Sequence, residues 1–272
     1  MNPDKPKKPF AWEPLTPPGV AAFAGAPWGR LGFVQLIVAL LAATTVVWFL
    51  KTAWFPVLTR AVRELPVQGE IRDGKLSVPG DAPQLLAESR FLAFVVDLQH
   101  AGQVRSPAHV QAEFGRQDIY FFSLLGYQQL SYPPGQNFVF NRLELEPKWG
   151  AWQPPLLWIT FGLVVAGLML IWTVLATIYC VPVWLAGFFA NRHLSFGASW
   201  KLAGAALMPG ALLLTAAILF YGLGALDLVQ LAAAFAAHFL IGWIYLLAAP
   251  LFAPKLEAIT VTDKNPFAGS PK

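Results

Sequence analysis

Charged residues are scarce in this chain of 272 residues. Lys, Arg, Asp and Glu make up 12% of it, whereas a soluble domain usually carries about 25%. Four stretches contain no charged residue at all: 31–50, 149–191, 202–226 and 228–254. Each is long enough for the roughly 20 residues with which an α-helix crosses about 30 Å of hydrocarbon. The composition therefore argues against an ordinary soluble enzyme and predicts a polytopic α-helical membrane protein embedded in a lipid bilayer.

Cysteine and familiar catalytic motifs are also scarce. The single cysteine, Cys180, excludes an internal disulfide, so a domain outside the membrane has to fold on its own core. The sequence has no G-x-S-x-G, H-E-x-x-H, P-loop or G-x-G-x-x-G motif. Its basic residues are dispersed along the chain, which argues against nucleic-acid binding despite a net charge of +4. The sequence predicts no cofactor, no metal and no catalytic residue.

The apolar stretches divide the chain into four predicted membrane helices. The second stretch is too long for one span, so we expect the Pro154-Pro155 pair to open a helix and Pro182 to bend the chain. The N-terminal segment is rich in Pro and Lys and is expected to be disordered. The predicted order is a disordered cytoplasmic tail 1–30, helix 31–54, domain 55–150, helix 155–179, cytoplasmic connector 180–201 with an interfacial segment, helices 202–221 and 228–251, and cytoplasmic tail 255–272.

Two features predict how the helices are oriented. The first apolar run is longer than the usual signal-peptide core and lacks a cleavage pattern, which favours an uncleaved signal anchor over a cleaved signal peptide. With the N-terminus inside, the cytoplasmic segments hold nine Lys and Arg residues, whereas the opposing short loop 222–227 holds none. We therefore expect both termini in the cytoplasm.

The segment 51–148 holds 20 of the 34 charged residues and is expected to contain a small α+β extracytoplasmic domain, inserted between the first two helices. Its best hairpin signal is 70–78, which alternates around Asp73-Gly74, a pair suited to a type I′ turn. Three further strands are predicted at 90–98, 118–125 and 138–145, and a short helix that begins at Ser106-Pro107 and runs to Phe114.

Three polar residues are candidates for a functional role. His238 lies in the middle of the last span, where an ionisable group is costly. It could relay a proton, bind a metal or contact a ligand, or it could be a neutral imidazole hydrogen-bonded to a neighbouring helix. Asp227 precedes the same helix and is explained by capping, with ion binding as the alternative. Asp97 belongs to a polar group in the domain that could converge on a ligand or a metal, although solvent exposure is the simpler interpretation for the two histidines of that group. The other members are His100, His109, Glu113 and Asp118.

Small residues at four-residue spacing predict close helix packing in the last span. Ala233 and Ala237 form one such pair, and Ala232 and Ala236 form another. Gly204, Ala205 and Gly210 in the preceding span could supply the partner surface. The pattern indicates packing within the protein first, and contact with a membrane-protein partner or a second copy of the chain as an alternative.

The order of parts resembles a bacterial membrane-protein family of unknown function, domain-of-unknown-function family eleven-eighty-nine. The resemblance rests on Ile71-Arg-Asp-Gly-Lys-Leu-Ser-Val-Pro79, on Phe94-Val-Val-Asp97, on Asp118-Ile-Tyr120, and on Ser195-Phe-Gly-Ala-Ser-Trp-Lys201 leading to Met208-Pro209. Some members of that family are labelled maltodextrin-utilisation proteins, and the family is distantly similar to Yip-type membrane proteins. The resemblance implies a multi-pass protein of a bacterial cytoplasmic (inner) membrane and supplies no activity, catalytic residue or cofactor.

Three functions are compatible with these features. The first is a non-enzymatic membrane protein whose external domain senses, binds or docks something. The second is an accessory subunit of a transport or envelope-assembly complex, which would use its helices as the contact surface. The third is a membrane enzyme that uses His238.

Overall fold

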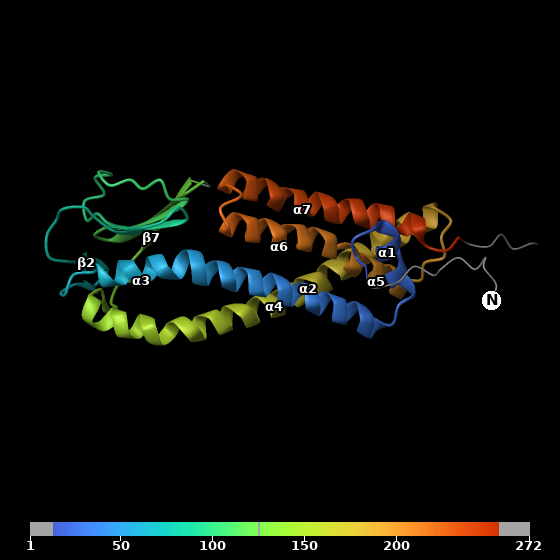
Figure 1. The fold of residues 1–272 in the computed structure, drawn as a ribbon, viewed down its shortest axis with the longest axis horizontal. Coiled ribbons are helices and arrows are strands. Elements are labelled where there is room, and N and C mark those ends of the chain that lie inside the picture. Colours follow the sequence, from blue (N-terminus) through green and yellow to red (C-terminus); the bar gives the residue numbers. More distant parts are fainter. Residues whose placement is uncertain (1–12, 125, 256–272) are drawn as a thin grey trace, which may run out of the picture. The chain divides into compact units, whose positions relative to one another are not determined.

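The structure is a computed structural model that describes residues 13–124 and 126–255. The chain divides into two compact units, one made of Met1–Gln35, Ile171–Pro209 and Leu240–Lys272 and the other of Leu36–Leu170 and Gly210–Phe239. A small sheet domain lies in the chain between the first and second long helices, as predicted (Figure 1). Four helical segments are long and apolar enough to cross a membrane, and these are Trp28–Arg63, Arg142–Phe189, Phe196–Gly222 and Leu228–Phe252.

The first long helical segment changes character near its end. Helix α2 (Trp28–Phe49) leads into one π-helical turn, η2 (Leu50–Trp54), and then into α3 (Phe55–Arg63). Pro56 lacks the N–H that an α-helix would pair with the Thr52 carbonyl, and π-turns are common where the regular bonding pattern is interrupted. The predicted boundary between membrane helix and domain, at residue 55, thus falls where α3 begins.

The second long helix, α4 (Arg142–Phe189), is longer than predicted and is assigned as one 48-residue helix. The predicted start at 155 and end at 179 are therefore wrong, and Pro182 lies inside a helix that continues for seven more residues. A proline removes one backbone hydrogen bond, but ending a helix within an apolar stretch would leave several carbonyls without partners. Continuing the helix is the less costly arrangement.

The last two spans are interrupted near their prolines. Helix α5 (Phe196–Ala206) is followed after one residue by α6 (Met208–Gly222), because Pro209 cannot donate to the Ala205 carbonyl. Helix α7 (Leu228–Ala248) passes into the 3₁₀ turn η3 (Ala249–Phe252).

The prediction of a disordered N-terminal tail is wrong for the part that the structure describes. Residues from Pro17 form α1 (Pro17–Ala22) and the 3₁₀ turn η1 (Phe23–Gly25). The Thr16 hydroxyl accepts a hydrogen bond from Gly19 N at 3.2 Å and so caps α1, and Phe23 is completely buried. These local signals outweigh the proline-rich composition. Residues 1–12 and nearly all of the predicted C-terminal tail, 256–272, lie outside the described residues.

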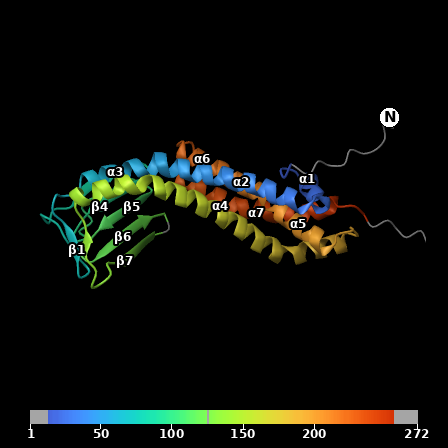
Figure 2. The ribbon, with the colours of Figure 1, turned by 90° about the horizontal axis from the view of Figure 1, so that it is seen from below.

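The sheet domain contains two sheets (Figures 1 and 2). The smaller has the strand order β2-β1-β8 and is antiparallel. The larger has the order β3-β4-β5-β6-β7 and is antiparallel except for the parallel pair β4 and β5. The strands are β1 (Glu70–Arg72), β2 (Lys75–Ser77), β3 (Gln84–Glu88), β4 (Leu92–Val96), β5 (Val110–Phe114), β6 (Asp118–Ser123), β7 (Gly126–Ser131) and β8 (Phe138–Val139).

The local predictions for this domain have mixed outcomes. The hairpin is confirmed, because Arg72 pairs with Lys75 across Asp73 and Gly74, and both turn residues have positive φ angles. The strands predicted at 90–98 and 118–125 correspond to β4 and β6. The helix predicted at 106–114 is wrong, since β5 occupies its second half. The strand predicted at 138–145 is only two residues long, because α4 begins at Arg142.

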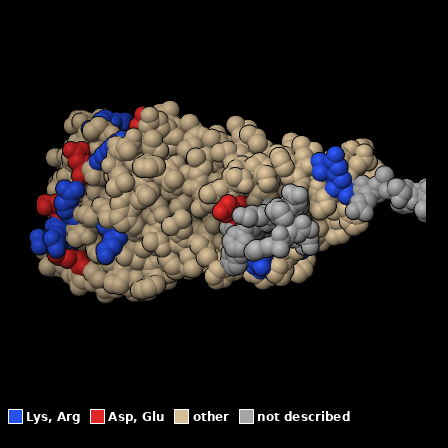
Figure 3. Space-filling model, turned by 45° about the vertical axis from the view of Figure 1, so that its right-hand side comes forward, with Lys and Arg blue, Asp and Glu red and all other residues tan. Residues whose placement is uncertain are grey.

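The core of the domain lies between α3 and one face of the larger sheet. In Figure 2 helix α3 runs beside the strands of this sheet, and it contacts β3 and β4. Val57, Ala61 and Leu65 from α3 and its end pack against Leu92 and Val96 of β4. Helix α3 is thus part of the core of the sheet domain. Figure 3 shows the Lys, Arg, Asp and Glu side chains of this domain gathered together, next to a broad surface of uncharged residues.

Candidate functional site

A crossover segment, residues 97–109, covers the face of the larger sheet that α3 does not. It joins the parallel strands β4 and β5, a connection that needs about a dozen residues or more. In this protein it contains neither helix nor strand. Asp97 fixes its start, because its two carboxylate oxygens accept hydrogen bonds from Gln99 N at 3.2 Å and Gly102 N at 3.1 Å. Asp97 is 1% exposed, so the observed bonds give it a structural role.

A buried carboxylate lies under this crossover segment. Glu113 of β5 is 0% exposed, and its Oε1 is 2.5 Å from His100 Nδ1. Its Oε2 accepts from Gln111 Nε2 at 3.4 Å, and the His100 ring stacks on Tyr120 with centroids 4.0 Å apart. A buried carboxylate requires such partners. Of the five polar residues predicted to converge, His100 and Glu113 therefore meet directly, whereas Asp118 instead binds Ser131.

An arginine in the connection between β3 and β4, Arg90, binds the turn between α6 and α7. Arg90 donates from Nη1 to the Gly224 carbonyl at 3.0 Å and from Nη2 to the Leu226 carbonyl at 2.9 Å. Gly224 has a φ of +80°, and an added Cβ would lie 3.0 Å from the Arg90 guanidinium. The positive φ therefore favours glycine here, and a larger side chain would require the Arg90 guanidinium to shift slightly. The sheet domain is thus attached to this turn by side-chain bonds as well as through the chain.

A histidine–tyrosine pair strengthens the same contact. His109 Nδ1 lies 2.6 Å from the hydroxyl of Tyr221 at the end of α6. Phe91 packs edge-on against the Tyr221 ring, with centroids 5.0 Å apart. Burial lowers the pKa of His109 below its usual 6.5, the neighbouring Arg90 charge lowers it further, and Asp227 opposes the shift. His109 is therefore a neutral partner at physiological pH, not the exposed loop histidine that the simpler interpretation assumed.

Asp227 begins α7 with a reciprocal cap. Its Oδ1 accepts from Gln230 N at 2.7 Å, while Gln230 Oε1 accepts from Asp227 N at 2.9 Å. This is the bonding pattern of a capping box, which satisfies two helix-terminal donors. The capping role predicted for Asp227 is confirmed.

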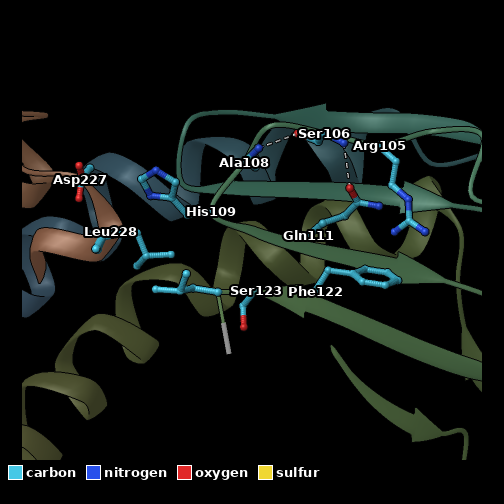
Figure 4. A pocket seen from close by; sticks show the side chains of 11 residues that line it. Arg105, Ser106, Ala108, His109, Gln111, Phe122, Ser123, Asp227 and Leu228 are labelled. Carbon is cyan, nitrogen blue, oxygen red and sulfur yellow. Dashed lines mark hydrogen bonds between the residues drawn. The ribbon is translucent and has the colours of Figure 1, made fainter. Parts of the chain in front are cut away.

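A pocket of about 490 Å³ lies between the crossover segment, β6 and the start of α7. Figure 4 shows His109 and Asp227 at one side of it, and Arg105 and Phe122 at the other. The Arg105 guanidinium lies 4.6 Å from the centre of the Phe122 ring, a cation–π contact. The remaining lining residues are Ser106, Ala108, Gln111, Ser123, Leu124, Leu228 and Val229.

The backbone around this pocket is held by side-chain bonds. The Gln111 side chain accepts from Ser106 N at 2.9 Å (Figure 4). It also donates to the Val104 carbonyl at 3.4 Å. Ser106 Oγ in turn accepts from Ala108 N at 3.2 Å. The wall that carries Arg105 and His109 is therefore fixed to β5, so both side chains project from an ordered loop.

His238 lies apart from this pocket in the middle of α7. Its Nδ1 contacts the Phe235 carbonyl of its own helix, and its ring packs on Phe239 with centroids 3.8 Å apart. Gly210 of α6 packs against the His238 backbone, because an added Cβ would lie 2.4 Å from the His238 carbonyl oxygen. The expectation that Gly210 contacts α7 is confirmed, although at His238 and not at the alanine pairs.

Several residues of the site were not singled out in the sequence. No local sequence motif surrounds Arg90, Arg105 or Tyr221. Arg90 and Tyr221 each bond a residue more than a hundred positions away, and Arg105 lies in the crossover segment, against Phe122. Among the described residues, no three His, Cys, Asp or Glu side chains lie together in a way that could hold a metal ion. Comparisons with protein-family models, curated proteins and solved structures gave no match, so the family resemblance stays a prediction.

Proposed function

We propose that the protein is a non-enzymatic, multi-pass protein of a bacterial cytoplasmic membrane whose sheet domain binds a ligand outside the cytoplasm and passes the signal to its last two helices. The apolar character of the four helical segments supports the membrane location, and the basic residues of the short flanks support an external domain.

The observation that carries the proposal is the bonded contact between the sheet domain and the turn joining α6 and α7. A domain that did not act on the last two helices would need no side-chain bonds to the turn that joins them, which is distant in the sequence. Arg90 and His109 supply three such bonds. The pocket lies beside them and is lined both by the sheet domain and by the start of α7. A ligand that changes the position of the crossover segment would therefore change the bonds that hold the start of α7. Such differential contact is what links a binding event to a conformational equilibrium.

The coupling can be tested in the full-length protein reconstituted in lipid nanodiscs. Arg90→Ala removes both bonds to the turn, so hydrogen–deuterium exchange of residues 223–230 is expected to rise and to be accompanied by faster exchange in residues 104–110. Arg60→Ala is the matched control, because Arg60 also donates to a carbonyl, that of Glu88, but within the domain. Unchanged exchange of the turn in Arg90→Ala would remove the basis of the proposal.

A second candidate function is an accessory subunit that contacts a partner through its helices. Ala232 and Ala236 are both exposed on α7, so this small-residue face is open to another helix. Crosslinking in the membrane followed by purification distinguishes the two functions. A stable complex that is lost on Ala232→Leu and Ala236→Leu substitution supports the accessory subunit.

A further inference from the structure

Strand β7 forms an open edge of the larger sheet. It pairs with β6 along its whole length, and no described strand pairs with its other side (Figure 2). All six of its residues are exposed. An edge strand presents a row of unpaired N–H and C=O groups, and another extended chain can pair with them.

The pairing of β6 with β7 determines which backbone groups of this edge are open. Tyr132 N, directly after β7, donates to the Gln117 carbonyl at 3.0 Å. Bonded and non-bonded positions alternate in an antiparallel pair, and the register of β6 and β7 has no shift. The even-numbered residues of β7 therefore bond to β6. The N–H and C=O groups of Tyr127, Gln129 and Ser131 point away from β6, at the two-residue spacing of an extended chain.

The two edges of the larger sheet differ. At the other edge, the ladder of β3 has a register shift between Leu85 and Ala87, and β3 contacts helix α3. A bulge and a covering helix are two of the features by which proteins block an edge. Strand β7 has a regular register, no charged residue and no proline. The edge formed by β7 is therefore the one that suits a partner strand.

The side chains around β7 indicate which kind of strand fits. Phe122 lies opposite Tyr127, and their rings stack with centroids 6.1 Å apart. The Phe122 ring is also parallel to the His100 ring, at 6.2 Å. This row of rings ends at Tyr127, which is 65% exposed, and on the opposite face of β7 Leu130 is 60% exposed. Because aromatic side chains pair favourably across strands, the edge fits a segment with an aromatic residue beside Tyr127 and an apolar residue beside Leu130.

A closed dimer through β7 does not fit within one membrane. Two copies of one edge strand form such a dimer by antiparallel pairing about a two-fold axis perpendicular to the sheet. Helix α3 lies along the face of the sheet and belongs to the same helical segment as α2, Trp28–Arg63 (Figure 2). The axis would therefore cross this segment at a large angle and would turn the second copy upside down in the bilayer. The occupant that fits is a segment of another polypeptide.

We propose that the open edge of β7 binds an extended, uncharged segment of another polypeptide, which adds a strand to the larger sheet and places an aromatic side chain beside Tyr127. In this mode main-chain hydrogen bonds supply affinity and alternate side chains supply specificity. The inference rests on the proposed function, because it names the class of ligand that the sheet domain binds. Leu124, shortly before β7, lines the pocket beside the α6–α7 turn, so the added strand would lie next to the proposed coupling contact.

The test uses the full-length protein in nanodiscs and a dye-labelled peptide with the sequence of residues 118–123, carrying Asp118→Asn. This is the strand that β7 already accepts on its inner side. Fluorescence polarisation measures binding, and empty nanodiscs give the background. We expect saturable binding. Methylating the backbone nitrogens of the peptide at positions 120 and 122, or at 119 and 121, removes the donors of one edge only. One of these two methylated peptides should lose binding and the other should keep it.

Variants of β7 test the same contact from the side of the protein. Gln129→Pro removes an N–H that points away from β6, a position where an edge strand tolerates proline. We expect it to weaken the peptide about tenfold or more, because one hydrogen bond is lost and the ring obstructs the partner strand. Gln129→Thr keeps the N–H and is the matched control, with unchanged affinity. Tyr127→Ala should weaken the peptide about two- to tenfold through the loss of aromatic stacking.

Four outcomes would overturn the inference. The first is the absence of saturable binding up to about 1 mM peptide. The second is an equal effect of the two methylated peptides, a measurement that needs no variant of the protein. The third is unchanged affinity in Gln129→Pro that unfolds at the same temperature as the unmodified protein. The fourth is efficient disulfide dimerisation of Gln129→Cys in cell membranes, in a Cys180→Ala background, which would assign the edge to a second copy.

Hydrogen exchange of residues 223–230 separates failure of this inference from failure of the proposed function. Peptide binding without altered exchange supports the strand-addition site and contradicts the signalling function. A response of the turn to Arg90→Ala in a protein that binds no peptide supports the coupling and overturns the strand-addition site.

Discussion

Helix α6 packs so closely on α7 at Gly210 that even an alanine there should destabilise the protein. A Cβ added at Gly210 would lie 2.4 Å from the His238 carbonyl oxygen and 3.3 Å from its carbonyl carbon, both of which are backbone atoms. Because no flexible side chain can move aside, the two helices must separate. Overpacking of this kind costs about 1–3 kcal/mol. Replacing glycine by alanine in a helix contributes roughly 1 kcal/mol in the opposite direction.

We therefore expect Gly210→Ala to lower the free energy of unfolding by up to about 2 kcal/mol, which is the overpacking cost of about 1–3 kcal/mol less the gain of roughly 1 kcal/mol in helix propensity. Gly167→Ala in α4 is the matched control, because no atom lies within 4 Å of its added Cβ. That variant should be as stable as the unmodified protein or more so. Thermal unfolding in detergent, followed by the fluorescence of a thiol-independent dye, measures both changes. Equal stability of the two variants would refute the close approach of α6 and α7 at His238.

Three further outcomes are expected. Tyr221→Phe keeps the ring and removes the hydroxyl that contacts His109, so it should lower the free energy of unfolding by about 0.5–1.5 kcal/mol. In a double-mutant cycle measured by thermal unfolding, the effects of Tyr221→Phe and His109→Gln should not be additive. Additive effects would contradict an interaction between the two side chains. Because the pKa of His109 is lowered in the folded protein, the unfolded chain takes up a proton first as the pH falls below 6.5. The free energy of unfolding should therefore decrease from pH 7 to lower pH, and it should decrease less in His109→Gln. Identical pH profiles of the two proteins would count against a buried neutral imidazole. With Cys180 replaced by Ala, Ser77→Cys should react with an impermeant thiol reagent in intact cells, because Ser77 is exposed in the sheet domain; labelling only after permeabilisation would reverse the proposed orientation.

The parts of the fold that could be predicted from the sequence are those determined by neighbouring residues. The Asp73-Gly74 turn is encoded by two residues that tolerate positive φ angles, and the structure has both in that region. The four apolar segments likewise follow from composition over short windows. Thr16 and Pro17 carried a helix-start signal at α1, but the proline-rich composition around them suggested disorder.

The parts that could not be predicted depend on contacts between distant residues. Ser106-Pro107 has the local pattern of a helix start, yet the chain continues as β5 because Gln111 and Glu113 are buried under the crossover segment. Arg90 is more than 130 residues from the turn whose carbonyls it binds. Of the candidate site, the sequence therefore pointed to Asp227 and to the group containing His109, but not to the side chains that complete the pocket.

The bonds of Arg90 and His109 hold the sheet domain against the turn between α6 and α7. The distance between spin labels at Ala108→Cys on the crossover segment and Val229→Cys on α7, both of which line the pocket, tests this attachment in a Cys180→Ala background in nanodiscs. We expect a single narrow distance distribution that broadens when Arg90→Ala is added. A broad distribution in the presence of Arg90, or one that Arg90→Ala leaves unchanged, would contradict the attachment.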